Sequence, residues 1–154
     1  MADKNVNEKL NVLAGVVDKE SKTYSFEKTV TMEGGIKKTG AFTAKYPGIG
    51  ARLRMGALRA KLLEGAPNQS IDGGTDDIAY MIAYLTVALT KTPQWFNPMS
   101  IDDYDDLREL YMEVYNFVVA FREANEQGAN AGSSKVTTGT TAVEDMPRTP
   151  ITDK

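Results

Sequence analysis

The spacing of apolar residues changes along the chain from a period of two to helical spacing. From Lys22 onward apolar and polar residues alternate, which indicates a strand with one buried face. Two glycines, Gly34 and Gly35, follow and supply the positive φ angles that a two-residue turn between antiparallel strands requires. The pattern therefore predicts a β-hairpin over 22–46. Its apolar positions are Tyr24, Phe26, Val30, Met32, Ile36, Phe42, Ala44 and Tyr46.

Three segments after Pro47 have the spacing of helices. The first, at 49–64, is rich in strong helix formers and ends at a Gly-Ala-Pro sequence. The second, at 75–90, begins at Thr75 as a cap and is apolar on every side, which is typical of a helix in the middle of a core. The third, at 100–126, begins at Ser100 in a capping-box spacing. Its apolar stripe comprises Tyr104, Leu107, Tyr111, Val114, Val118 and Phe121.

The two ends of the chain differ from the middle. Apolar residues at 6, 10, 13 and 17 lie at intervals of four, three and four, so a short helix is one interpretation of an N-terminal arm at 1–20. The last segment, 127–154, consists mainly of Gly, Ala, Ser and Thr and has too little apolar surface to fold alone. We expect a single domain at 21–126 and a flexible, disordered tail at 127–154. The predicted fold class is α+β, mostly α, with an N-terminal β-hairpin packed on about three helices.

Charge is distributed unevenly over the 154 residues, although the net charge is only −3. Residues 1–65 contain 12 Lys and Arg against 7 Asp and Glu, whereas residues 66–126 contain 3 against 11. These two blocks should attract one another within a molecule or between copies. The basic side chains at 52–61 lack aromatic neighbours for base stacking, so we expect them to be solvated or to pair with acids and not to bind nucleic acid.

The chain contains no cysteine and no histidine. It therefore lacks thiolate metal ligands, disulfides and the commonest general base. Four aspartates at 102, 103, 105 and 106 could bind magnesium, but successive helical residues point in different directions, so a cap and a solvated surface are the favoured interpretation. We expect no catalytic, cofactor-binding or metal-binding residues, and no enzymatic activity.

A membrane location is also not expected. The longest nearly apolar segment, 78–89, has 12 residues, whereas a bilayer span needs about 20. The N-terminus is charged where a signal peptide would be apolar, so we expect a soluble protein that stays in the cytoplasm where it is made.

The order of these features resembles the tail assembly chaperones of long-tailed bacteriophages. A hairpin that ends in FTAKYPGIGARLRMGALRAKLLEG, an apolar helix, a TPQWF loop and IDDYDDLRELYMEVYNFVVAFRE follow one another over about 20–126. The family's P-x-W element is matched by Pro93 and Trp95, and Trp95 is interpreted as closing the core, with an exposed partner anchor as the alternative. The family's helix motif is matched by Asp103 or Asp105, followed by Leu107, Tyr111, Val114 and Phe121.

This resemblance implies a non-enzymatic role in virion assembly in the cytoplasm of a host bacterium. Such chaperones coat the tape measure protein before the tail tube polymerises around it, and they are absent from the mature virion. The implied partners are the tape measure protein, the tail tube protein and further copies of the chain. A structural virion component of the tail or neck is the alternative.

A partner site can be proposed from the residues outside the predicted stripe. If the stripe faces the domain's own core, Leu110 and Phe117 form a second apolar edge that would bind an apolar helical client. Acidic side chains beside this edge could pair with the basic helix of a neighbouring copy. These charged residues are Asp106, Glu109 and Glu113 on one side and Arg52 and Arg59 on the other.

Overall fold

The structure, a computed structural model, describes residues 10–131 and contains a four-stranded antiparallel sheet in the order β1-β2-β3-β4. The long strands β2 (Thr23–Met32) and β3 (Ile36–Lys45) pair along their whole length. The short strands β1 (Val16–Asp18) and β4 (Leu89–Lys91) add one edge each. The α+β class predicted from the sequence is therefore observed, but the sheet has four strands and not the two that we expected.

The period-two pattern places one face of β2 and β3 in the core. Tyr24 lies opposite Ala44 and Phe26 opposite Phe42, and all four side chains are buried. The opposite face carries threonine pairs such as Thr29 and Thr39, whose hydroxyl oxygens are 2.6 Å apart. An antiparallel sheet can keep one face in water in this way. The connection between the strands has three residues, 33–35, in which Gly34 and Gly35 have φ angles of 82° and 72°.

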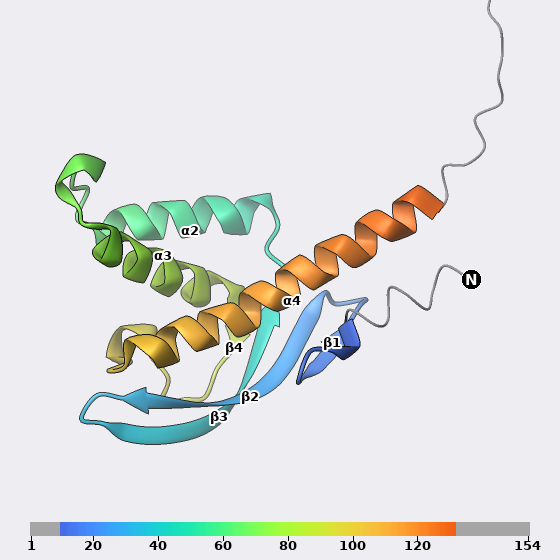
Figure 1. Cartoon of the computed structure of the whole chain (residues 1–154), viewed down its shortest axis with the longest axis horizontal. Helices are drawn as coiled ribbons and strands as arrows, with labels where there is room; N and C mark the ends of the chain where they lie inside the picture. The colour runs from blue at the N-terminus through green and yellow to red at the C-terminus, as the bar shows by residue number, and fades with distance from the viewer. Residues whose placement is uncertain (1–9, 132–154) are drawn as a thin grey trace, which may run out of the picture.

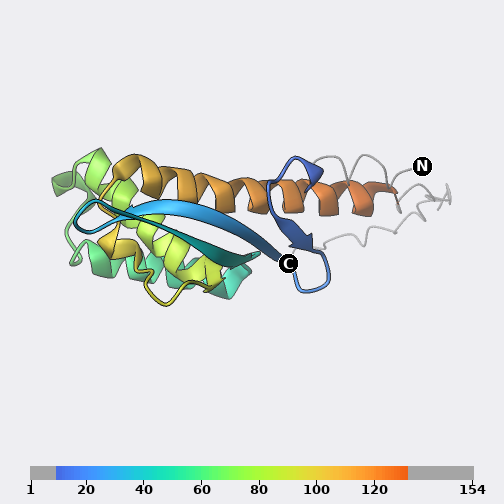
Figure 2. The same ribbon diagram turned by 90° about the horizontal axis from the view of Figure 1, so that it is seen from below.

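Three long helices complete the described part of the chain (Figure 1). They are α2 (Ile49–Leu62), α3 (Gly73–Ala88) and α4 (Tyr104–Ala131), and two short 3-10 helices, η1 (Asn68–Ser70) and η2 (Pro98–Ser100), lie between them. The arrangement places α3 between α2 and α4, and α4 runs along the sheet. Figure 2 shows that α4 is the longest element and that its C-terminal end extends beyond the helices α2 and α3.

A single hydrophobic core joins the sheet to α3 and α4. The middle of α3 is almost completely buried, as its apolar sequence predicts, although Ile78 and Tyr80 near its start are exposed. By contrast, α2 has a single buried residue, Met55, and packs mainly on α3. The helix α2 is therefore the most peripheral element of the three.

Two predicted helix caps are corrected by the structure. Asp72, and not Thr75, caps α3, because the Asp72 carboxylate accepts hydrogen bonds from the backbone N–H and the hydroxyl of Thr75. Asp103, and not Ser100, precedes α4, and its carboxylate accepts a hydrogen bond of 2.8 Å from the backbone N–H of Asp105. Ser100 ends η2 instead, and its carbonyl accepts a hydrogen bond from Glu33.

The loop before η2 covers one side of the sheet. Trp95 and Phe96 are half-buried and contact Phe42 edge to face, with ring centroids 6.4 and 4.9 Å from the Phe42 ring. Trp95 therefore packs at the margin of the core, as we expected.

The ends of the predicted domain also differ from the structure. Val17, which we placed on a helix face, lies in β1 and pairs with Tyr24, while residues 1–9 lie outside the described part. The helix α4 continues past the predicted end at 126 to Ala131, and the rest of the predicted tail, 132–154, lies outside the described residues. Within residues 10–131, no helix combines the length and the hydrophobicity needed to span a membrane.

Candidate binding groove

The apolar edge predicted on α4 is not exposed. Leu110 and Phe117 are both 0% exposed and belong to the core beneath the sheet, where the Phe117 ring stacks on Tyr24 at 5.2 Å. The buried face of α4 is rotated toward these two residues relative to the predicted stripe, so that Tyr104 is exposed and Tyr111 only partly buried. The reason is chemical, since the wholly apolar Leu and Phe side chains fill the core, while tyrosines, which carry a polar hydroxyl, lie at its margin.

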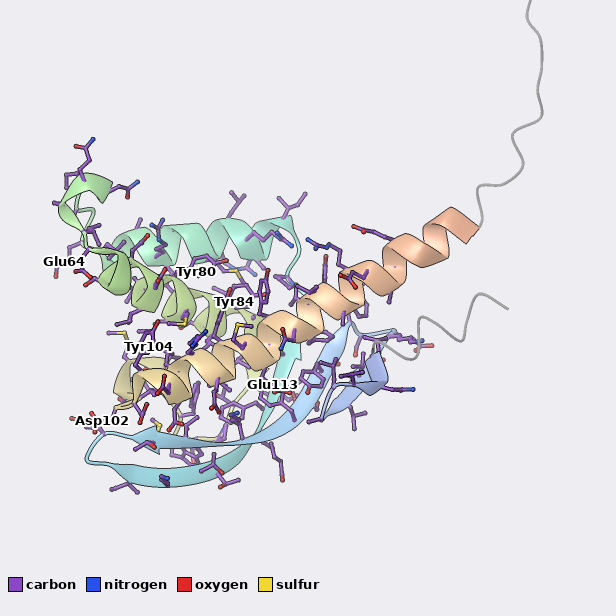
Figure 3. All side chains as sticks on the ribbon, in the orientation of Figure 1. Glu64, Tyr80, Tyr84, Asp102, Tyr104 and Glu113 are labelled. Carbon is purple, nitrogen blue, oxygen red and sulfur yellow. The ribbon has the colours of Figure 1, made fainter. Side chains whose placement is uncertain are left out.

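The three acidic residues predicted to meet a neighbouring copy bind the chain's own sheet. Asp106 accepts a hydrogen bond of 2.6 Å from the backbone N–H of Thr31, and hydrogen bonding to Thr31, through its side chain first and its backbone second, lowers the pKa of the Asp106 carboxyl. Glu109 forms an ion pair of 2.8 Å with Lys28. Glu113 accepts a hydrogen bond from the Tyr24 hydroxyl (Figure 3 labels Glu113). These carboxylates therefore fasten α4 to β2.

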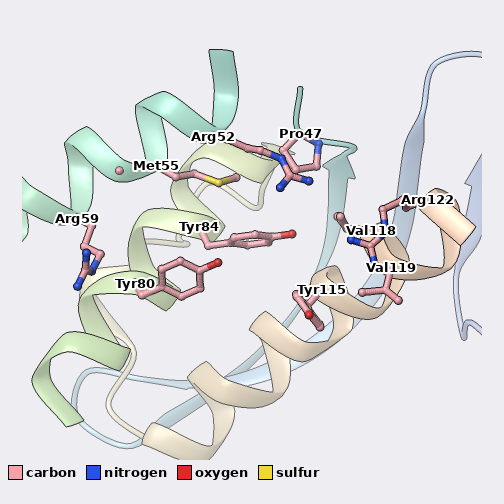
Figure 4. A pocket seen from close by; sticks show the side chains of 11 residues that line it. Pro47, Arg52, Met55, Arg59, Tyr80, Tyr84, Tyr115, Val118, Val119 and Arg122 are labelled. Atoms are coloured by element: carbon pink, nitrogen blue, oxygen red, sulfur yellow. The ribbon is translucent and has the colours of Figure 1, made fainter. Parts of the chain in front are cut away.

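The two predicted basic residues, Arg52 and Arg59, do share a site. Both line a groove of about 440 Å³ between α2 and α4, with α3 as its floor (Figure 4). Arg59 is fixed by a hydrogen bond of 2.7 Å from its Nε to the Asp76 carboxylate on α3. The α4 side of the groove adds a third cation, Arg122, which is exposed.

Tyrosines form the aromatic part of this groove. Tyr80 and Tyr84 rise from α3 and Tyr115 from α4, as Figure 4 shows. Ring contacts connect them through Tyr111, whose centroid is 5.1 Å from that of Tyr84 and 5.6 Å from that of Tyr115. Burial raises the pKa of the Tyr84 and Tyr111 hydroxyls above the ordinary value for tyrosine. We call this groove, with its three tyrosines and three arginines, the Tyr-Arg groove.

The sequence analysis missed the tyrosines of this groove, although they carry a signal. Tyr80 and Tyr84 are four residues apart, as are Tyr111 and Tyr115, so each pair lies on one helix face. Tyrosine and arginine are enriched at protein interfaces because they combine a large apolar contact area with hydrogen-bonding groups. The sequence does not show that the pair on α3 contacts the pair on α4.

The described residues that line the groove are apolar, aromatic and basic. None of the described residues that line it is acidic, and the described residues contain no group of three or more Asp and Glu side chains placed to hold a metal ion. Its apolar floor and cationic rim would bind an apolar segment with acidic side chains. Comparison with models of known protein families, with curated proteins and with solved structures gives no match to this chain.

Proposed function

We propose that this protein is a non-enzymatic tail assembly chaperone of a long-tailed bacteriophage, which acts in the cytoplasm of the host bacterium. Its client is the tape measure protein, and the Tyr-Arg groove holds a helical segment of that client. The resemblance of 20–126 to this family motivates the proposal, and the client site differs from the edge of Leu110 and Phe117 because both of those side chains are buried.

The observation that carries the proposal is an open groove between two helices with exposed aromatic side chains. Tyr80 on the floor and Tyr115 on the α4 wall are exposed, while Tyr84, also on the floor, is buried. An amphipathic helix placed between α2 and α4 would contact α3 along its floor, which is the helix-in-groove mode of recognition. Arg52 and Arg122 would then pair with acidic residues on the flanks of the bound helix, while Arg59 stays paired with Asp76.

The first prediction tests this site by client capture. The tagged full chain is co-expressed with the product of the long helical reading frame expected beside its coding sequence, and the complex is isolated and its affinity measured. Tyr80→Ala and Tyr115→Ala should each weaken the affinity for the client at least about tenfold, because tyrosines that become buried when a partner binds are frequent interface hot spots. Both residues are exposed in the isolated chain, so the variants should still fold.

Met99→Ala provides the matched control, since Met99 is also exposed but lies in η2 outside the groove. It should leave the affinity unchanged. Capture at wild-type affinity by both tyrosine variants would place the client elsewhere. Finding the protein in purified virions, with no capture under any condition, would instead favour a structural component of the tail or neck.

A further inference from the structure

Two arginines on opposite walls of the Tyr-Arg groove are open to a further carboxylate. Within residues 10–131, Arg52 on α2 is exposed and forms no ion pair. Arg122 on α4 is also exposed, and its Nε lies 3.9 Å from the carboxylate of Glu126, which makes a weak pair on the surface of one helix. Figure 4 shows Arg52 and Arg122 on the two sides of the groove. A segment that enters the groove with carboxylates would therefore meet a cation on either wall.

The helix α4 brings the C-terminal part of the chain close to this groove. It lines the groove as far as Arg122 and continues to Ala131. At about 1.5 Å per helical residue, Ala131 lies about 14 Å along the axis from Arg122 and about 24 Å from Tyr115. An extended chain spans up to about 3.3 Å per residue, so the segment from Ala131 to Ala142 can cover about 36 Å. Residues from 142 onward can therefore reach back along the whole α4 wall.

One short segment of residues 132–154, which lie outside the described part, has the composition that the groove requires. It places two adjacent carboxylates between apolar residues, and it is the only part of 132–154 that does so. We call it the AVEDM segment, and its residues are Ala142, Val143, Glu144, Asp145 and Met146. The third acidic residue of 132–154, Asp153, lies between Thr152 and Lys154 and has no apolar neighbour.

We propose that the AVEDM segment docks in the Tyr-Arg groove of its own chain and competes there with the client. Val143 and Met146 contact the tyrosines, and the two carboxylates pair with Arg52 and Arg122. The groove, at about 440 Å³, has the size of pockets that hold a drug-sized ligand, and hence a few side chains. A short tether gives the segment an effective concentration on the order of millimolar, so a contact too weak to persist between separate molecules is populated within one chain.

This docking would regulate the groove. The segment covers the exposed tyrosines of the isolated chain, and a client that makes a larger contact displaces it. The competition rests on the proposed function, whereas the docking requires only the chain itself. The two can therefore be tested separately.

The second prediction is that the AVEDM segment lies beside the groove in the full chain without any client. Because the chain has no cysteine, Thr141→Cys provides a single site for a nitroxide spin label. The label should broaden the amide NMR signals of Val119 and Arg122, which line the groove. It should not broaden the signal of Thr29, which is exposed on the outer face of the sheet.

Charge reversal identifies the contacts. Glu144→Lys combined with Asp145→Lys should abolish the broadening at the groove, while Asp153→Lys, the matched control outside the segment, should preserve it. Combining the first pair of substitutions with Arg52→Glu and Arg122→Glu should restore the broadening, because the charge pairs are then re-formed with opposite signs. Both arginines are exposed, so these variants should fold, and their amide spectra check this.

Two further measurements decide between the possible occupants. A mixture of spin-labelled chain with unlabelled, nitrogen-15-enriched chain should show no broadening, and broadening there would overturn the inference in favour of docking between copies. In the client assay of the first prediction, the chain with Glu144→Lys and Asp145→Lys should bind about two- to tenfold more tightly than the wild type, because no segment competes. Asp153→Lys should match the wild type, which controls for the added charge.

The inference and the proposed function fail in different ways. Client capture without broadening at the groove in the isolated chain would overturn the docking and leave the proposed function standing. Broadening that survives Glu144→Lys with Asp145→Lys, or an unchanged client affinity of that variant, would also overturn the inference. Broadening at the groove with no client captured under any condition would support the docking and overturn the proposed function.

Discussion

At the scale of single residues, hydrogen bonds to carboxylates stabilise the contact of α4 with the sheet. Asp103 caps the helix, Asp106 accepts a backbone N–H of β2, and Glu113 accepts the hydroxyl of Tyr24. That hydroxyl in turn accepts a hydrogen bond of 3.0 Å from the backbone N–H of Gly15, so one tyrosine connects the N-terminal segment, the sheet and α4. Asp103 and Asp106, near the start of α4, therefore stabilise this helix and its contact with the sheet.

The third prediction concerns the cap of α4. Asp103→Ala should lower the free energy of unfolding by about 1 kcal/mol, because the backbone N–H of Asp105 loses its acceptor. Ser100→Ala should change it by less than about 0.5 kcal/mol, since the interaction of Ser100 with Glu33 uses the backbone carbonyl. Urea denaturation followed by circular dichroism measures both. A larger loss for Ser100→Ala than for Asp103→Ala would contradict this assignment of the cap.

At the scale of elements, the loop between β4 and η2 is fitted closely to β3. A Cβ atom added at Gly40 would overlap with Cγ of Pro93 and Cζ2 of Trp95. Glycine at this strand position is therefore required by close packing, which also holds Trp95 against Phe42. The contact explains how a short loop that contains Pro93 closes one side of the sheet.

The fourth prediction follows from this close approach. Gly40→Ala should lower the free energy of unfolding by about 1–3 kcal/mol, because the loop must move to admit the methyl group. Gly56→Ala is the matched control, since nothing lies within 4 Å of the added Cβ in the middle of α2. It should raise the stability by about 0.5–1 kcal/mol through helix propensity. Chemical denaturation of both variants, with Trp95 fluorescence as a probe of the loop, distinguishes the two signs.

At the scale of the whole molecule, buried tyrosines connect the stability of the core to alkaline pH. Burial raises the pKa of the Tyr24, Tyr84 and Tyr111 hydroxyls, and for Tyr24 the neighbouring Glu113 carboxylate raises it further. The unfolded chain loses these protons near pH 10, whereas the folded chain retains them. Since the folded state then binds more protons, its stability is complete below about pH 10 and falls as the pH rises toward the folded-state pKa.

The fifth prediction is a loss of stability at high pH that depends on these side chains. The free energy of unfolding of the wild type should decrease steadily above about pH 10. Tyr24→Phe should reduce the slope of this decrease by the contribution of about one proton per molecule, because the proton of Tyr24 is then no longer lost on unfolding. Tyr104→Phe, at an exposed site, serves as the control for the removal of a tyrosine hydroxyl. Denaturant titrations at several pH values measure the slope, and tyrosinate absorbance reports the ionisation. An unchanged slope for Tyr24→Phe would show that this hydroxyl does not hold its proton in the fold.

The sequence by itself determined the elements whose signals are local. Alternation over 22–46 determined β2 and β3, because a strand with one face in the core needs a residue of the right polarity at every second position. Helical spacing and good helix formers located α2, α3 and α4 to within a few residues, except that α4 continues five residues past the predicted end. The glycines at 34 and 35 located the turn, since their φ angles of 82° and 72° are costly for other residues, but the connection has three residues, 33–35, and not the two that we expected.

Only the tertiary structure decided which faces of these elements meet. On α4 most of the predicted stripe is buried as expected, but the core also takes in Leu110 and Phe117, which removed the predicted partner edge. The buried residues of the stripe are Leu107, Val114, Val118 and Phe121. The strands β1 and β4 have three residues each, too few to show a period, and they exist because a longer neighbour supplies their hydrogen bonds. The Tyr-Arg groove likewise combines residues of α2, α3 and α4. These residues are far apart in the sequence and come together only when the helices pack, so no local sequence pattern predicts the groove.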